Sequence, residues 1–198
     1  MSLSIADGDL RPGFADPVLD GQRSFRAVLQ AMSRPATVVP LAPFGDSPAG
    51  IRAAAAATVL TLVDFDTALW LDDAAAPAAA YFRFHCGCTI VAVPEQADFA
   101  LIADPATMPP LAAFKDGDDD FPDRSATLIL QVEAFADIGA RYSGPGIEGT
   151  LAFSARPLPG DFVTQWRGNT ALYPRGVDLI LAGETALAAL PRSSRMEG

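Results

Sequence analysis

The chain contains very few of the side chains that catalysis and cofactor binding commonly use. Its 198 residues include one histidine, His85, one lysine, Lys115, and two cysteines, Cys86 and Cys88. Covalent chemistry with pyridoxal phosphate needs a buried lysine. Lys115 precedes the acidic stretch 116–120, where neighbouring carboxylates should keep it charged. The sequence therefore argues against a Schiff-base cofactor, and we expect no cofactor.

Other missing motifs and features exclude further classes of function. No phosphate-binding G-x-x-x-x-G-K-[ST] loop and no G-x-S-x-G nucleophile motif occurs. The net charge of -10 is unfavourable for nucleic-acid binding, which depends on basic side chains. The longest apolar run, residues 53–63, is about half of the roughly 20 residues that a membrane span needs. With no basic leader at the start, we expect a cytoplasmic protein without nucleic-acid or membrane partners and without a disulfide.

Apolar periodicity predicts several helices. In residues 20–35, Phe25, Val28, Leu29 and Met32 form one helical stripe, and Pro35 should end the helix. A second helix is expected over 47–64, with Ser47 as N-cap and the following proline at its first position. Two further helices are predicted over 76–84 and 159–174.

Short apolar segments between these helices predict strands. The predicted strands span residues 36–40, 67–71, 88–93, 97–103, 126–135, 177–183 and 185–191, with a hairpin-like pair over 140–153. The acidic segment 115–123 lacks the regular ligand spacing of a calcium loop and is expected to be a solvated turn. This order predicts one α/β domain over 1–198, with a mixed, mostly parallel sheet flanked by helices and a loose tail over 1–16.

The motif His85-Cys-Gly-Cys88 suggests a metal-binding site or a redox pair. Zinc usually takes four ligands, and these three are all the histidine and cysteine the chain has. If the motif were extended, alternation would place Cys86 and Cys88 on one face and His85 on the other. A metal site would then need Gly87 to bend the chain and a further ligand. We favour the interpretation that both cysteines fill small spaces in the core, where a helix meets a strand.

The glycines Gly144, Gly146 and Gly149 satisfy the pattern G-x-G-x-x-G. In a dinucleotide-binding domain such a loop opens a helix, whereas the sequence after Gly149 is strand-like and then broken by proline. These glycines are better explained by a turn that needs positive φ or a close backbone approach.

Two Pro-Arg pairs stand at the ends of apolar strands. Arg175 and Arg192 have the planar donors that clamp a carboxylate or phosphate in a bidentate manner. The alternative, favoured from the sequence, is that each arginine holds a turn or pairs with an acid such as Asp178.

The ordered set of segments resembles a known family over nearly the whole chain. The matching segments are QRSFRAVLQAMSRPATVV, LTLVDFDTALWL, RFHCGCTIV, PEQADFAL, SATLILQV, GPGI, YPRGVDLIL and LPRSS. Together they are similar to the H subunit of the bacterial carbon–phosphorus lyase system. The resemblance implies a core complex with the G, I and J subunits, which forms ribose 1-alkylphosphonate 5-triphosphate from ATP and an alkylphosphonate. It also implies a fold related to the pyridoxal-phosphate-dependent transferases with the cofactor lost, and a homodimer when the subunit is isolated.

The resemblance places catalysis and metal binding in other subunits, so we expect an assembly subunit with no catalytic or metal-binding residue of its own. The candidates for ligand binding, most of them on family motif positions, are Asp64, Arg83, His85, Gly144, Gly146, Arg175, Asp178 and Arg192. The alternative is a stand-alone nucleotide- or phosphonate-binding domain, or a transferase, with a vestigial cofactor pocket near the strand ends that carry Arg and Gly.

Overall fold

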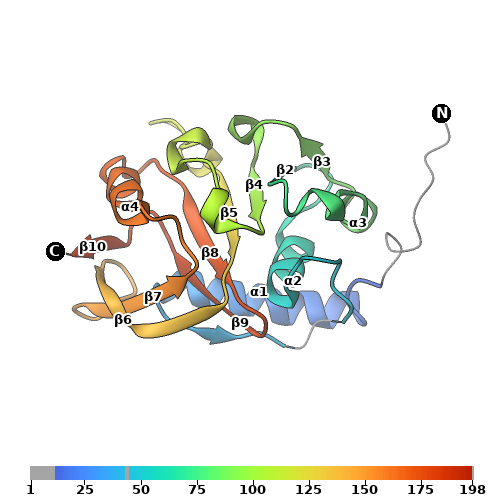
Figure 1. Cartoon of the computed structure of the whole chain (residues 1–198), viewed down its shortest axis with the longest axis horizontal. Helices are drawn as coiled ribbons and strands as arrows, with labels where there is room; N and C mark the ends of the chain where they lie inside the picture. The colour runs from blue at the N-terminus through green and yellow to red at the C-terminus, as the bar shows by residue number, and fades with distance from the viewer. Residues whose placement is uncertain (1–11, 43–44, 198) are drawn as a thin grey trace.

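The structure is a computed structural model that describes residues 12–42 and 45–197. It is built around a seven-stranded sheet, most of whose strands are labelled in Figure 1. The order across the sheet is β1-β9-β8-β5-β4-β2-β3. Strands β3, β2, β4, β5 and β8 run parallel, and β9 and β1 are antiparallel to their neighbours. The strands are β1 (Val39–Pro40), β2 (Ala68–Leu71), β3 (Thr89–Val91), β4 (Phe99–Ile102), β5 (Thr127–Gln131), β8 (Asp178–Ala182) and β9 (Ala186–Leu190). The predicted mixed, mostly parallel sheet is confirmed.

Central strands are buried on both faces, which explains their continuous apolar sequences. Side chains alternate along β5, so Ile129 joins one hydrophobic core while Leu128 and Leu130 join the other. Helices α1 (Pro17–Ser33), α2 (Ala53–Leu62) and α3 (Ala79–Cys86) contribute to the first core. The helix α4 (Phe162–Ala171) contributes Phe162 and Trp166 to the second core.

A second sheet, which the sequence did not predict, covers part of the face that carries α4 (Figure 1). It consists of β6 (Ala134–Ser143), β7 (Leu151–Arg156) and β10 (Arg195–Glu197), all antiparallel. The hairpin expected over 140–153 corresponds to the end of β6, a glycine turn and the start of β7. The short β10 pairs with β6 and brings the C-terminal segment beside α4.

Helix α1 packs through small residues rather than through the whole predicted stripe. Its buried residues are Ser24, Ala27, Val28 and Ala31, and it lies against α2 and β9. Small side chains allow this close approach. Two members of the stripe, Phe25 and Leu29, remain 49% and 56% exposed. The structure therefore leaves an apolar face of α1 open to solvent.

Three predicted boundaries were wrong. The second helix begins at Ala53 instead of Ser47, because Gly50 adopts a φ of +81° that a helix does not allow. The strand expected over 126–135 is two strands, since β5 ends at Gln131 and the chain crosses to β6 in the second sheet. The strand expected over 88–93 forms only over Thr89–Val91 and lies half-exposed at the sheet edge.

The remaining predicted strands and the helices over 76–84 and 159–174 are present, although several are shorter than expected. Residues 1–11 of the expected N-terminal tail lie outside the described residues. Residues 12–14 lie against α3, where Tyr81 Oη donates a 3.5 Å hydrogen bond to the Pro12 carbonyl. Within residues 12–42 and 45–197, we find no helix that combines the length and apolar character of a membrane span.

Candidate functional site

Among the charged candidate residues, Arg192, which follows β9, makes the most hydrogen bonds. Its Nε and Nη2 atoms donate to the two carboxylate oxygens of Asp178 at 3.1 and 2.7 Å. The Arg192 backbone N–H also donates to Asp178, and Nη1 donates to the Pro122 carbonyl. Both charged side chains are mostly buried. Arg192 therefore ties β9, β8 and the loop before β5 together, as the structural interpretation predicted.

Two candidate glycines bring the β6–β7 turn close to other segments. Gly144 has a φ of +136°, and a Cβ there would lie 2.6 Å from the Ser193 carbonyl oxygen. Gly146 has a φ of +83°, and its Cβ would overlap the Ser33 carbonyl oxygen at the end of α1. The prediction of positive φ and close backbone approach is confirmed. The segment after Gly149 opens strand β7 rather than a helix, as expected.

The Gly144 turn and Arg192 border a hollow of about 310 Å³. Its lining residues are Ser143, Gly144, Pro145, Thr170, Tyr173, Arg192, Ser193 and Arg195. A second hollow of about 430 Å³ shares Thr170, Tyr173 and Arg195 with it and adds Arg167. We call these two hollows together the α4 groove. It combines guanidinium groups with hydroxyl groups, which is chemistry suited to an anion.

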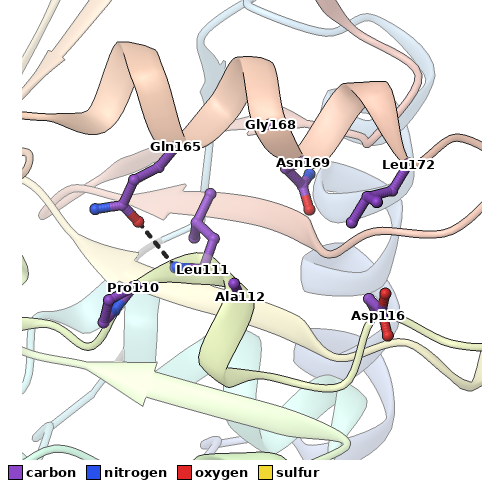
Figure 2. A pocket seen from close by; sticks show the side chains of 8 residues that line it. All are labelled: Pro110, Leu111, Ala112, Asp116, Gln165, Gly168, Asn169 and Leu172. Carbon is purple, nitrogen blue, oxygen red and sulfur yellow. Dashed lines mark hydrogen bonds between the residues drawn. The ribbon is translucent and has the colours of Figure 1, made fainter.

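Arg175 is engaged elsewhere, beside another pocket. Its guanidinium pairs with Asp116 and Asp119 of the acidic loop, each at 3.3 Å. Asp116 also lines a pocket of about 380 Å³ between α4 and the 3₁₀ turn at Leu111–Ala113 (Figure 2). The pocket is lined by Pro110, Leu111, Ala112, Asp116, Gln165, Gly168, Asn169 and Leu172.

The amide side chains in this second pocket already have partners. Gln165 accepts from Leu111 N at 2.8 Å, the bond drawn in Figure 2. Asn169 is bonded in both directions to the Val177 backbone. These amides fasten α4 to its surroundings, so the pocket offers mainly apolar walls to a ligand.

Asp64, Arg83 and His85 do not belong to the α4 groove. Arg83 and His85 lie on α3, and Asp64 lies in the turn between α2 and β2. The His85 ring packs 4.4 Å from the Tyr81 ring centroid and 5.0 Å from that of Phe84. The structure therefore divides the eight candidates among several places instead of gathering them in one site.

The two cysteines lie around the end of α3, and the extended geometry considered for the motif is wrong. His85 and Cys86 are the last helical residues, and Gly87 ends the helix at a φ of +69°. A hydrogen bond from the Cys86 thiol to the Cys88 sulfur, followed by burial, raises the pKa of Cys86 far above its usual range. The same bond lowers the pKa of Cys88. No group of three metal-ligating side chains occurs among the residues that the structure describes.

The carboxyl edge of the parallel strands, where open α/β sheets commonly bind ligands, is filled by the protein itself. Asp72 is buried and accepts 2.8 Å hydrogen bonds from the backbone of Ala75 and Asp104. Gln131 is also buried, accepts from Arg52 N and donates to the Gly50 carbonyl. Neither residue was among the candidates predicted from the sequence, although each is a polar residue at the end of an apolar strand.

Lys115, the only lysine, forms an ion pair with Asp98 at 2.6 Å. Asp98 also accepts a hydrogen bond from Ala68 N at the start of β2. Lys115 thus serves as a structural cation beside the sheet. The sequence had suggested partners in the acidic stretch 116–120, whereas the structure pairs Lys115 with Asp98.

These features define an α/β protein whose strongest polar interactions hold the fold together. The family model for bacterial phosphonate metabolism protein (PhnH) matches residues 12–197. The chain is 35% identical over 190 residues to the alpha-D-ribose 1-methylphosphonate 5-triphosphate synthase subunit PhnH of Rhizobium meliloti, covering 93% of this chain and 94% of that protein. It is 30% identical over 176 residues to the putative C-P lyase subunit protein HtxG of Stutzerimonas stutzeri, covering 88% and 85%. The chain belongs to the PhnH family.

Proposed function

We propose that this chain is an assembly subunit of a carbon–phosphorus lyase core complex, together with G, I and J subunits. It supports the formation of ribose 1-alkylphosphonate 5-triphosphate from ATP and an alkylphosphonate without itself performing the chemistry. Two relatives that match over most of their length are named as subunits of such systems. Their names motivate the proposal, and the structure offers a surface that suits it.

That surface is the exposed apolar face of α1, and it is the observation that carries the proposal. Val18, Phe25 and Leu29 are 78%, 49% and 56% exposed. Their spacing of seven and four residues places them on one face of the helix. Contiguous exposed apolar side chains are characteristic of surfaces that contact another protein. We assign this face to a contact with another subunit.

The polar candidates support the same proposal. Arg192 and Asp178 bind each other, and Arg175 binds the acidic loop. Each interaction stabilises the fold, and none sets up a nucleophile with an adjacent base, as covalent catalysis requires. A scaffold role accounts for these contacts without any reacting group.

We further propose that the fold is a relative of the pyridoxal-phosphate-dependent transferases that has lost its cofactor. This proposal rests on the sequence resemblance, and the mixed sheet with helices packed on it is compatible with it. The pairing of Lys115 with Asp98 supports the loss of a Schiff-base lysine. We also propose one domain over 1–198, a cytoplasmic location, and a homodimer when the partner subunits are missing.

Co-expression with the G, I and J subunits tests the assembly role. The tagged chain should retain all three subunits through affinity purification and gel filtration. Light scattering of the chain purified alone should give the mass of a dimer. A chain that elutes apart from the other three subunits would contradict the proposal.

The alternative function is a stand-alone nucleotide- or phosphonate-binding domain or transferase. A transferase would require the isolated chain to convert ATP and methylphosphonate, with release of adenine. We expect no adenine from the isolated chain, as measured by chromatography of the reaction mixture. Adenine release that depends on the chain would favour the alternative.

A further inference from the structure

The α4 groove differs in charge from the chain as a whole. The sequence has ten more acidic than basic side chains. Nevertheless the groove is lined by Arg167, Arg192 and Arg195, which come from α4 and from the C-terminal segment. Such a local concentration of guanidinium groups on an acidic protein marks a place where an anion would be favoured.

Two of these arginines have their charge available. Arg23, Arg52 and Arg175 are paired with carboxylates. No carboxylate of the described residues lies within ion-pair distance of Arg167 or Arg195, nor of some exposed arginines outside the groove such as Arg26 and Arg34. Both guanidinium groups can therefore offer their N–H donors to a ligand.

Arg192 has a different task, because it fixes the wall of the groove. Its bidentate bond to Asp178 and its bond to the Pro122 carbonyl use three of its five N–H groups. Gly144 packs against the Ser193 carbonyl on the same wall. The backbone around the groove is thus held in place without a ligand, which lowers the cost of binding one.

Hydroxyl groups line the space between the guanidinium groups. Thr170, Tyr173 and Ser193 contribute three of them. Thr170 Oγ1 donates to the Arg167 carbonyl at 3.2 Å, whereas Ser193 and Tyr173 make no side-chain hydrogen bond within the described chain. Ser143 donates to Glu197, so the rim near β10 also carries one carboxylate. Tyr173 and Ser193 therefore keep their hydroxyl donors available to a ligand, although Glu197 lies on the same strand as Arg195.

We propose that the α4 groove binds the oligophosphate group of a small-molecule ligand, with Arg167 and Arg195 as its cationic contacts. A di- or triphosphate carries several negative charges and an extended row of acceptor oxygens. This matches two guanidinium groups flanked by hydroxyl donors better than a single carboxylate would. The inference concerns binding alone and does not depend on assembly with other subunits.

Calorimetric titration of the full chain with inorganic tripolyphosphate tests the site, with inorganic sulfate as an anion of low charge. Tripolyphosphate should bind, and sulfate should bind at least about tenfold more weakly. The variant Arg167→Gln/Arg195→Gln should lose at least about tenfold in affinity, since each charged hydrogen bond contributes about one order of magnitude. The matched control is Arg26→Gln/Arg34→Gln, which removes the same charge from exposed positions of α1 and its C-cap.

Three outcomes would contradict the proposed site. Absence of heat with millimolar tripolyphosphate would overturn the proposal. An equal loss in the α1 control would show that net charge alone attracts the anion. A hexaglutamate peptide that binds more tightly than tripolyphosphate would make the groove a docking surface for an acidic protein segment. Unchanged thermal midpoints in both double variants would confirm that the comparison is between folded proteins.

Discussion

Arg192 and Asp178 form a bidentate ion pair whose side chains are only 16% and 12% exposed. The pair joins the segment that follows β9 to the first residue of β8, at the open end of the β8–β9 hairpin. Removing one partner leaves the other charged and largely buried. This asymmetry makes the pair sensitive to mutation even though a buried pair by itself adds little net stability.

Arg192→Ala should therefore lower the free energy of unfolding by about 3 kcal/mol. The matched control is Arg175→Ala, whose partners Asp116 and Asp119 are 40% and 92% exposed. That variant should lose no more than about 1 kcal/mol, because solvent screens its ion pairs. Urea denaturation measures both values. Equal losses of unfolding free energy in the two variants would show that the buried Asp178 pair matters no more for stability than the exposed pairs of Arg175.

Gly146 should not tolerate a side chain. A Cβ at this position would overlap the Ser33 carbonyl oxygen, and the φ of +83° adds strain. Gly146→Ala should fail to fold or lose more than about 3 kcal/mol. Gly149→Ala is the control, since Gly149 has a similar φ of +68° but nothing within 4 Å of its Cβ. It should lose only about 1 kcal/mol, and a comparable loss in both variants would mean that the contact with α1 is unimportant.

The order of helices and strands could be predicted because the buried strands are short, apolar and separated by turn residues. The break between β5 and β6 could not be predicted in this way. Apart from Glu133, the sequence stays apolar beyond Gln131, and the change of sheet depends on bonds from Val132 N to Ala182 and from Glu133 N to Arg156. These partners lie more than twenty residues further along the chain. Local periodicity contains no information about them.

The candidate residues show the same limit. The positive φ values of Gly144 and Gly146 follow from local turn chemistry, so they were predicted correctly. The α4 groove is different, because Arg167 and Arg195 meet only when β10 pairs with β6 beside α4. Neither arginine stands in a recognisable motif. A site made by distant segments needs the tertiary structure to be found.

Stability should fall at high pH because two tyrosines are buried. Burial raises the pKa of both Tyr81 and Tyr142 from 10.0 to about 12, with a smaller contribution from Cys86 at Tyr81. The folded state thus favours the protonated phenols. Their contribution is fully present below pH 10, the unfolded value, and is lost as the pH rises toward 12. Urea midpoints measured across this range should decrease, and Tyr142→Phe should make the decrease shallower.

The Cys86 thiol should react slowly although it is only partly buried. Its hydrogen bond to Cys88 and its burial hold the pKa above the usual range, so little thiolate is present near neutral pH. Cys88→Ala removes the acceptor and should speed alkylation of Cys86 by iodoacetamide by at least about tenfold. Mass spectrometry of timed samples measures the rate.

The variant Cys86→Ser/Cys88→Ser should still assemble, and loss of assembly would show that the pair does more than fill space.

The exposed face of α1 should be required for association and not for folding. Phe25→Lys/Leu29→Lys places two charges on this face while leaving the buried residues Ala27, Val28 and Ala31 in place. The double variant should keep its urea midpoint but lose its partners or its self-association in light scattering and co-purification. Gln30→Lys/Gln96→Lys is the control, because it adds the same charge at exposed polar positions outside the face of Val18, Phe25 and Leu29. An apolar contact cannot accommodate two buried lysine charges without a large desolvation cost, whereas charges outside the contact stay solvated. Retention of every partner by the Phe25 and Leu29 variant would therefore place the subunit contact on another surface.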